Sequence, residues 1–180
     1  PSVGVSRNRR VDMEPLLPTP MMQGALLLLE ELARQGRRIV TAESCTGGLL
    51  AGSLTQPAGA SEFVAGGFVT YSNAMKMRLL DVPSILLDLR GAVSSEVAAA
   101  MADGAVAVAP DADVAISVTG IAGPGGGSAE KPVGLVWFAV AIKQRQTRTV
   151  SVVFSGNRDS IRQQAVIYAQ TLVLDALHAG

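Results

Sequence analysis

The sequence is poor in the residues that build several common kinds of functional site. Its one cysteine, Cys45, excludes a disulfide within the chain and a zinc site made mainly of cysteine. Aromatic residues make up only 4%, and 15 basic residues balance 15 acidic ones, so a base-stacking surface and the basic excess of a nucleic-acid binder are both missing. No apolar run approaches the roughly 18–20 residues of a membrane span. We therefore expect a cytoplasmic protein with neither a nucleic-acid nor a membrane partner.

Histidine is equally scarce. The only one, His178, lies two residues from the end of the chain, where chain ends usually fray, so a Ser-His-Asp or Cys-His mechanism is disfavoured. The acidic residues are scattered and show no metal-ligand spacing. We expect a nucleophile that uses another base, with no metal ion and no cofactor.

What is present suffices for one domain. The chain has 180 residues, of which 48% are hydrophobic, enough for one sizeable core. Residues 1–20 hold several prolines and arginines and show no periodicity, which predicts a disordered tail ahead of a domain at 21–180.

Apolar periodicity predicts helices alternating with strands. Helices are expected at 22–35, 47–54, 73–80, 94–108 and from 157 or 159 to about 177; strands are expected at 38–42, 63–71 and 114–119, and a hairpin at 133–143 and 147–154. This order predicts an α/β sandwich whose sheet is mostly parallel, with an antiparallel part from the hairpin.

The first motif, TAESCTGG at 41–48, joins a predicted strand to a predicted helix. Ser44 would lie at that turn, where the free N–H groups and the dipole of a helix start suit a developing oxyanion. A polar helix cap with packing glycines explains the residues equally well. The motif is neither a P-loop nor a G-x-S-x-G elbow.

The second motif is YSNAMK at 71–76. Strand ends at one edge of a sheet gather above the same crevice, where desolvation would lower the pKa of Lys76 toward neutrality. Lys76 would then take a proton from a serine, and Tyr71 would relay that proton or hold the lysine. Taken alone, the pair is more typical of an ordinary solvated lysine.

Two further motifs are suited to anions. The segment from Thr119 and Gly120 to Ser128 follows a buried strand and is rich in glycine, so its N–H groups would form an anion-binding concavity or a simple flexible loop. Arg158 stands at the start of the last predicted helix, as in many phosphate sites, but by itself this is a weak signal, because a surface pair with Asp159 or a neighbouring acid also explains it.

Together these motifs closely resemble the C-terminal domain of the competence/damage-inducible protein CinA and its stand-alone nicotinamide-nucleotide amidase relatives. The stretches that carry the resemblance come in family order and span about residues 22–176: TAESCTGGLLA, GGFVTYSNAMK, GAVSSEV, SVTGIAGPGGGSAEKPVG and FSGNRDSIRQQA.

The resemblance implies a three-layer α/β/α sandwich with a mixed sheet. It implies hydrolysis of nicotinamide mononucleotide to nicotinate mononucleotide and ammonia in pyridine nucleotide salvage. The family's catalytic serine, tyrosine and lysine fall on Ser44, Tyr71 and Lys76, and its final-helix arginine falls on Arg158.

The mechanism that follows is acyl transfer to Ser44 with Lys76 as base. The oxyanion would be held by N–H groups of Cys45, Thr46 and Gly47. The phosphate would be held by Arg158 and by the glycine-rich loop with Thr119 and Gly120.

Two alternatives stay open. One is a non-catalytic nucleotide-binding or partner module in competence or DNA damage responses. The other is an amidase in which Cys45, with Glu43 and Lys76, replaces Ser44. The expected partner is a small-molecule nucleotide, and a homo-oligomer is compatible with the sequence.

Overall fold

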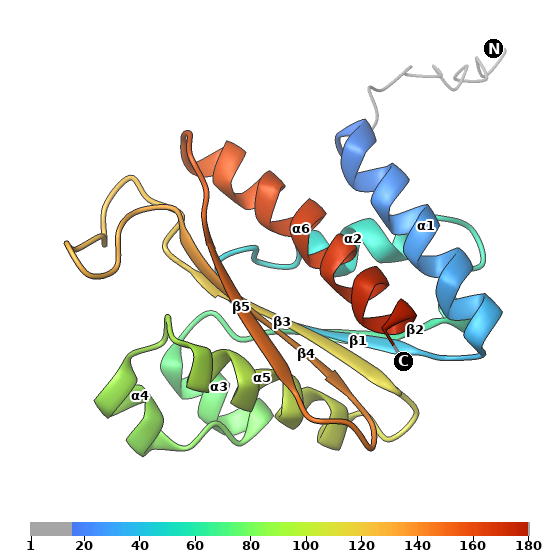
Figure 1. The fold of residues 1–180 in the computed structure, drawn as a ribbon, viewed down its shortest axis with the longest axis horizontal. Coiled ribbons are helices and arrows are strands. Elements are labelled where there is room, and N and C mark those ends of the chain that lie inside the picture. Colours follow the sequence, from blue (N-terminus) through green and yellow to red (C-terminus); the bar gives the residue numbers. More distant parts are fainter. Residues whose placement is uncertain (1–15, 180) are drawn as a thin grey trace, which may run out of the picture.

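The structure is a computed structural model that describes residues 16–179. A five-stranded sheet with the order β2-β1-β3-β4-β5 lies between two layers of helices (Figure 1). The strands are β1 (Ile39–Glu43), β2 (Val64–Val69), β3 (Val114–Gly120), β4 (Leu135–Ile142) and β5 (Arg148–Val153). β1 pairs in parallel with β2 and β3, whereas β4 is antiparallel to both β3 and β5. Only β4 therefore runs against the other strands, which confirms the expected three-layer sandwich with a mixed, mostly parallel sheet.

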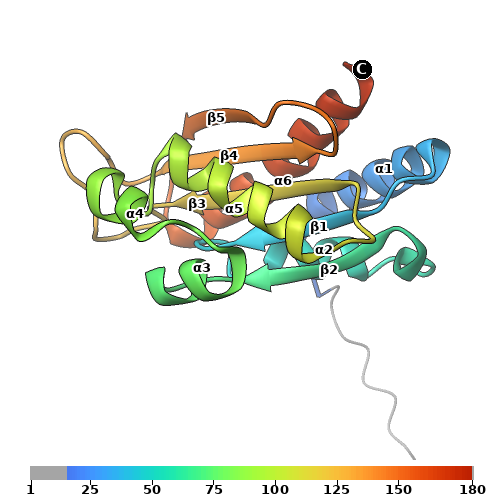
Figure 2. The same ribbon diagram turned by 90° about the horizontal axis from the view of Figure 1, so that it is seen from below.

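The helices divide between the two faces of the sheet, as the two orthogonal views show (Figures 1 and 2). One layer holds α1 (Thr19–Gln35), α2 (Leu49–Thr55) and α6 (Arg158–His178); the other holds α3 (Asn73–Leu80), α4 (Ser84–Arg90) and α5 (Ser95–Val108). A short 3-10 turn, η1 (Ala60–Glu62), leads into β2. Strand residues alternate between the layers, so Ile116 and Val118 pack in the α1–α6 core while Ala115 packs with α5.

A buried glutamine fixes the packing within the α1–α2–α6 layer. The Gln170 side chain donates from Nε2 to the Met21 carbonyl (3.0 Å) and to Ser53 Oγ (2.9 Å). A Cβ added at Gly24 would lie 2.2 Å from Gln170 Oε1, so a larger residue there would displace the glutamine amide. Gln170 thereby ties the second half of α6 to both α1 and α2.

Three expectations need correction. α2 begins at Leu49 and not at residue 47, because Gly47 and Gly48 have φ angles of 59° and 96°, outside the right-handed helical region. α4 was not among the expected helices; it begins directly after Pro83, which serves as its N-cap. The expected tail lies mostly outside the described residues, but Thr19 and Pro20 already belong to α1.

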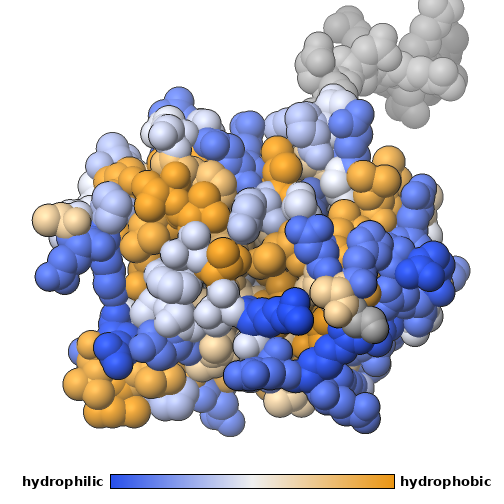
Figure 3. All heavy atoms as spheres, in the orientation of Figure 1, coloured by the Kyte–Doolittle hydropathy of each residue, from blue (hydrophilic) through white to orange (hydrophobic). Residues whose placement is uncertain are grey.

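The surface of the described part is mixed in character. Figure 3 shows apolar side chains gathered over α4, where Ile85 and Leu89 are exposed. Among residues 16–179, no helix combines the length and the apolar character that crossing a membrane requires.

Candidate active site

Ser44 and Lys76 meet at one edge of the sheet. Ser44 directly follows β1, and Lys76 lies in the first turns of α3, which begins soon after β2 ends. The N-cap Ser72 accepts a hydrogen bond from the Met75 N–H (3.2 Å) and so sets the start of α3. Lys76 Nζ consequently lies 3.0 Å from Ser44 Oγ, which is the contact that the two sequence motifs predict.

The surroundings of Lys76 suit a proton acceptor. Its side chain is only 1% exposed, and besides Ser44 it contacts the carbonyl oxygens of Thr70 (2.8 Å) and Tyr71 (3.4 Å). Burial lowers the pKa of Lys76 from 10.5 to about 8, because desolvation disfavours the ammonium form. A neutral amine would donate to the two carbonyls and direct its lone pair at the Ser44 hydroxyl, the arrangement that a general base requires.

The turn that carries Ser44 is closed by its own backbone. The Gly47 N–H donates to the Ser44 carbonyl (3.1 Å), and the Leu49 N–H donates to the Thr46 carbonyl (3.1 Å). Gly47 therefore has its N–H engaged within the turn. By contrast, the N–H groups of Cys45 and Thr46 donate to no other residue of the part that the structure describes.

The start of α2 is occupied by a side chain. The fully buried Glu43 carboxylate accepts from the N–H groups of Gly48 (3.0 Å), Leu50 (3.1 Å) and Ala51 (2.8 Å). The first N–H groups of α2 are thus already used, and of the three expected oxyanion donors only Gly47 is engaged. Free donors are found just ahead of the helix, at Cys45 and Thr46.

Cys45 is a poor candidate for the nucleophile. It is 7% exposed, and burial raises the pKa of its thiol to about 11. The thiolate is the reactive form of cysteine, so this environment suppresses its reactivity. The geometry therefore favours Ser44 over the Cys45 alternative.

Arg158 connects three of the motifs. Its Nη2 donates to Tyr71 Oη (3.2 Å), and its Nη1 donates to the Gly123 carbonyl (2.8 Å). The hydroxyl of Tyr71, whose residue is 62% exposed, thus contacts Arg158, while the contact of Tyr71 with Lys76 is through the backbone carbonyl. The end of β2, the glycine-rich loop and the start of α6 meet at this arginine.

Thr119 and Gly120 have structural reasons for their identity. Thr119 is buried, and its hydroxyl donates to the Ala92 carbonyl (2.8 Å). A Cβ at Gly120 would lie 2.8 Å from the Leu135 carbonyl oxygen, so glycine is needed where β3 passes β4. Both residues end β3 near the site, and their contact with substrate stays a prediction.

Sequence reasoning missed Arg162 and the capping role of Glu43. Arg162 donates from Nε to the Cys45 carbonyl (3.1 Å) and from Nη2 to the Thr46 carbonyl (3.2 Å). The available signal was its spacing, because Arg162 lies one helical turn after Arg158 and therefore on the same side of α6.

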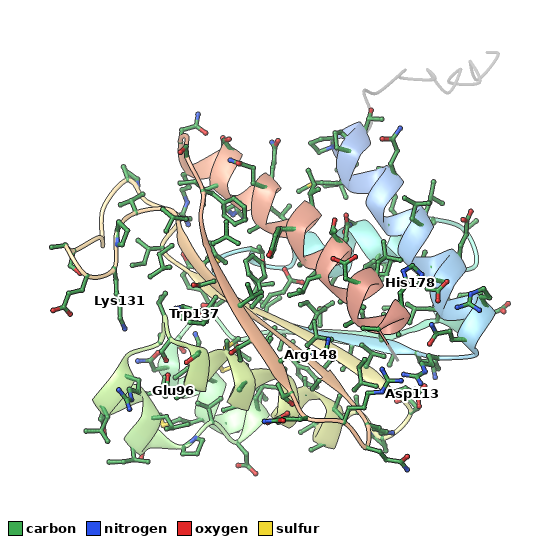
Figure 4. The ribbon with its side chains drawn as sticks, viewed as in Figure 1. Glu96, Asp113, Lys131, Trp137, Arg148 and His178 are labelled. Atoms are coloured by element: carbon green, nitrogen blue, oxygen red, sulfur yellow. The ribbon has the colours of Figure 1, made fainter. Side chains whose placement is uncertain are left out.

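His178 lies away from these groups. Figure 4 shows it at the far end of α6, beside the end of α1, where Nε2 lies 3.5 Å from a Glu31 carboxylate oxygen. The 21 residues of α6 span roughly 30 Å. Within residues 16–179, no group of three or more His, Cys, Asp or Glu side chains is arranged to hold a metal ion.

Comparison with known proteins gives a consistent result. Residues 23–177 match the family model described as the CinA C-terminal domain. The chain is 51% identical over 138 residues to the nicotinamide-nucleotide amidohydrolase PncC of Enterobacter agglomerans, covering 77% of this chain and 84% of that protein. It is 50% identical over 145 residues to a CinA-like protein of Mycolicibacterium vanbaalenii, covering 81% of this chain but 34% of that protein, so it spans about a third of that relative's length.

The fold is also similar to that of a solved structure. The crystal structure of the competence/damage-inducible protein CihA from Agrobacterium tumefaciens superposes with a TM-score of 0.87 at 42% identity. The superposition covers 92% of this chain and 99% of that one.

Proposed function

Because the chain belongs to the CinA C-terminal domain family, we propose that it hydrolyses the carboxamide of nicotinamide mononucleotide. The products are nicotinate mononucleotide and ammonia. The observation that carries the proposal is the 3.0 Å contact between the buried Lys76 amine and the Ser44 hydroxyl, in a chain about half identical to proteins named nicotinamide-nucleotide amidohydrolase.

The reaction begins with the serine. Neutral Lys76 accepts the hydroxyl proton as Ser44 Oγ bonds to the carboxamide carbon, and the carbonyl oxygen becomes an oxyanion. Collapse of this intermediate breaks the C–N bond, and the lysine proton passes to the departing nitrogen, which leaves as ammonia. Water, deprotonated by the same amine, then attacks the acyl-serine ester and releases the carboxylate, which restores the Ser44 hydroxyl.

The substrate phosphate is assigned to Arg158 and the glycine-rich loop. The guanidinium uses two donors on Tyr71 and Gly123 and carries five in all. It therefore retains donors for a phosphate oxygen at the start of α6, where the helix dipole also favours an anion. Thr119, Gly120 and Thr46 complete the proposed substrate contacts.

The setting of the enzyme follows from the same observations. A single buried cysteine is compatible with a reducing compartment, and we place the protein in the cytoplasm. Its partner is the small nucleotide substrate, and it acts without a metal ion or cofactor.

The test is an ammonia-release assay on nicotinamide mononucleotide, with free nicotinamide as the comparison substrate and Ser44→Ala as the control protein. Rapid release from the nucleotide, slow release from nicotinamide and no release by the variant are expected. If the wild-type protein bound the nucleotide but released no ammonia, it would be a non-catalytic binding module. Equal turnover of both amides would contradict the phosphate assignment.

A further inference from the structure

We infer that Arg162 is a positioning residue for catalysis, and that it acts through the backbone of Cys45 and Thr46. It holds the peptide between Cys45 and Thr46 so that the free Thr46 N–H receives the negative charge that develops on the carboxamide oxygen. The inference rests on the proposed function. It gives a role to Arg162, which the proposed function leaves without one.

The contacts of Arg162 are directed at the nucleophile turn. Its guanidinium, on half-buried α6, donates to two successive carbonyls, those of Cys45 (3.1 Å) and Thr46 (3.2 Å). Among the described residues no carboxylate forms a salt bridge with Arg162. The forked donor is thus used on the turn that carries Ser44, where it fixes the orientation of two peptide planes.

Peptide geometry then places a donor on the opposite side. The peptide between Cys45 and Thr46 is trans, so its N–H points away from its C=O. The C=O is directed at Arg162 in the α6 layer. The Thr46 N–H is therefore directed away from α6, and α3, which carries Lys76, lies in the helix layer on the other side of the sheet (Figure 1).

This N–H is unpartnered in a buried place. Thr46 is fully buried, and its N–H donates to no other residue in the described part of the chain. Buried backbone N–H groups without a partner are rare in native proteins. A donor that is kept free beside a nucleophile is suited to an oxygen that arrives with the substrate.

The charge of Arg162 strengthens the same donor. A cation bonded to a carbonyl polarises the peptide, and this makes the N–H of that peptide a better hydrogen-bond donor. Arg162 would thus stabilise the oxyanion without touching the substrate. The other end of the turn is held independently by Glu43, so loss of Arg162 should loosen the two peptides and leave the fold in place.

The experiment compares Arg162→Met and Arg162→Lys with the wild type and with Arg148→Met. Arg148 is an exposed arginine on β5 and forms no part of the site, so it is a matched control for removal of one arginine (Figure 4). Each protein is assayed with nicotinamide mononucleotide and with its thiocarboxamide analogue. Sulfur accepts hydrogen bonds weakly, so the rate ratio of the two substrates reports on the oxyanion donors.

Loss of a direct oxyanion donor costs about 10²–10³ in kcat, and an indirect contribution should be smaller. Arg162→Met is therefore expected to lower kcat roughly ten- to a hundredfold, with KM changed by less than about threefold. The rate ratio of amide to thioamide should fall several-fold, Arg162→Lys should recover part of both effects, and Arg148→Met should match the wild type. An unchanged kcat in Arg162→Met, or a lower kcat with an unchanged ratio, would overturn the inference.

A second measurement separates this inference from the proposed function. A fluorophosphonate forms a bond to Ser44 Oγ as fluoride leaves, and its phosphoryl oxygen needs the same N–H donors but no nucleotide site. Mass spectrometry measures the rate at which Ser44 is labelled. Slower labelling in Arg162→Met than in the wild type supports the positioning role even if nicotinamide mononucleotide is not a substrate. Equal labelling of both proteins, or no labelling of the wild type, overturns it.

Discussion

Charged side chains have different surroundings at the two ends of α6. At its start, Arg162 holds the turn of Ser44, and Lys76 is enclosed with its pKa lowered to about 8. At its end, Glu31 pairs with Arg34 and lies near His178, and hydrogen bonds from Arg34 lower the pKa of the Glu31 carboxyl to about 2. There, hydrogen bonds from Arg34 hold the Glu31 carboxylate in its charged form. Desolvation without a charged partner instead favours the neutral amine of Lys76, the form that the proposed mechanism needs.

Near the start of α6, removal of the Ser44 hydroxyl should have the largest effect on activity. Ser44→Ala should lower kcat by a factor on the order of 10³–10⁶, as in other serine hydrolases, with the fold intact. Cys45→Ala should keep substantial activity, because the thiol is held protonated. Ammonia release and circular dichroism of both variants check this. An active Ser44→Ala with an inactive Cys45→Ala would transfer the role to the cysteine.

Substitution of Lys76, the proposed base, should have the second-largest effect on activity. Lys76→Ala and Lys76→Arg should both reduce kcat/KM by roughly 10²–10⁴-fold, because arginine keeps its proton. In the wild type, kcat/KM should rise with pH and level off above about pH 8, as Lys76 loses its proton. If Lys76→Arg retained near wild-type activity, the lysine would serve as a positioning charge and its role as base would have to be withdrawn.

Loss of Arg158, which contacts Tyr71 and the glycine-rich loop at the start of α6, should lower activity less than loss of Lys76. Charge-assisted hydrogen bonds contribute roughly 1.5–3 kcal/mol each, so Arg158→Ala should lower kcat/KM about ten- to a hundredfold. Tyr71→Phe should have a smaller effect, since it removes one contact of Arg158 and keeps the carbonyl that contacts Lys76. Steady-state kinetics with the nucleotide and with free nicotinamide distinguish phosphate binding, because only the nucleotide should be affected.

Burial of Lys76 should also change how the stability of the protein depends on pH. Its pKa is lower in the folded protein than in the unfolded chain, so the unfolded state binds more protons between about pH 8 and 10.5. The wild-type free energy of unfolding should therefore gain about 2–3 kcal/mol relative to Lys76→Met between pH 7 and pH 10. Urea unfolding of the two proteins at both values measures this. A constant difference would show that Lys76 titrates as a solvated lysine.

The smallest effect is expected at the other end of α6. His178→Ala should leave kcat/KM unchanged and alter stability by less than about 1 kcal/mol, because the His178 side chain is largely exposed and solvent screens its contact with Glu31. Kinetics and thermal unfolding check both. A large loss of activity would show that the C-terminal end of α6 takes part in the reaction.

The proximity of Ser44 and Lys76 was predictable from the sequence because local patterns placed both residues at the ends of neighbouring strands, whereas their proposed roles came from the family resemblance. TAESCTGG and YSNAMK each follow a strand, and parallel strands bring those ends together. The contact between Arg162 and the Cys45 carbonyl was not predictable, since it depends on how α6 packs beside α2. That packing depends on the fit of Gln170 against Gly24, which no local pattern reports.

The helix start was wrongly assigned for a similar reason. Sequence spacing indicates where a helix begins, but it does not show whether a side chain already fills the site. Glu43 is the last residue of β1, and in an isolated strand its side chain would have no particular target. Only the parallel pairing of β1 with both neighbours directs its carboxylate to the N–H groups of α2.

The carboxylate of Glu43 also has a consequence for the dynamics of the chain. Because it is buried, its hydrogen bonds to Gly48, Leu50 and Ala51 can break only when the end of β1 separates from the first turn of α2. The segment with Ser44 lies between these two elements and cannot open alone. We expect these three amides to exchange their hydrogens with solvent only through global unfolding, together with the central strands. On this expectation Ser44, the proposed nucleophile, shares the slowest-exchanging unit of the protein, and any adjustment to a substrate would fall to the glycine-rich loop.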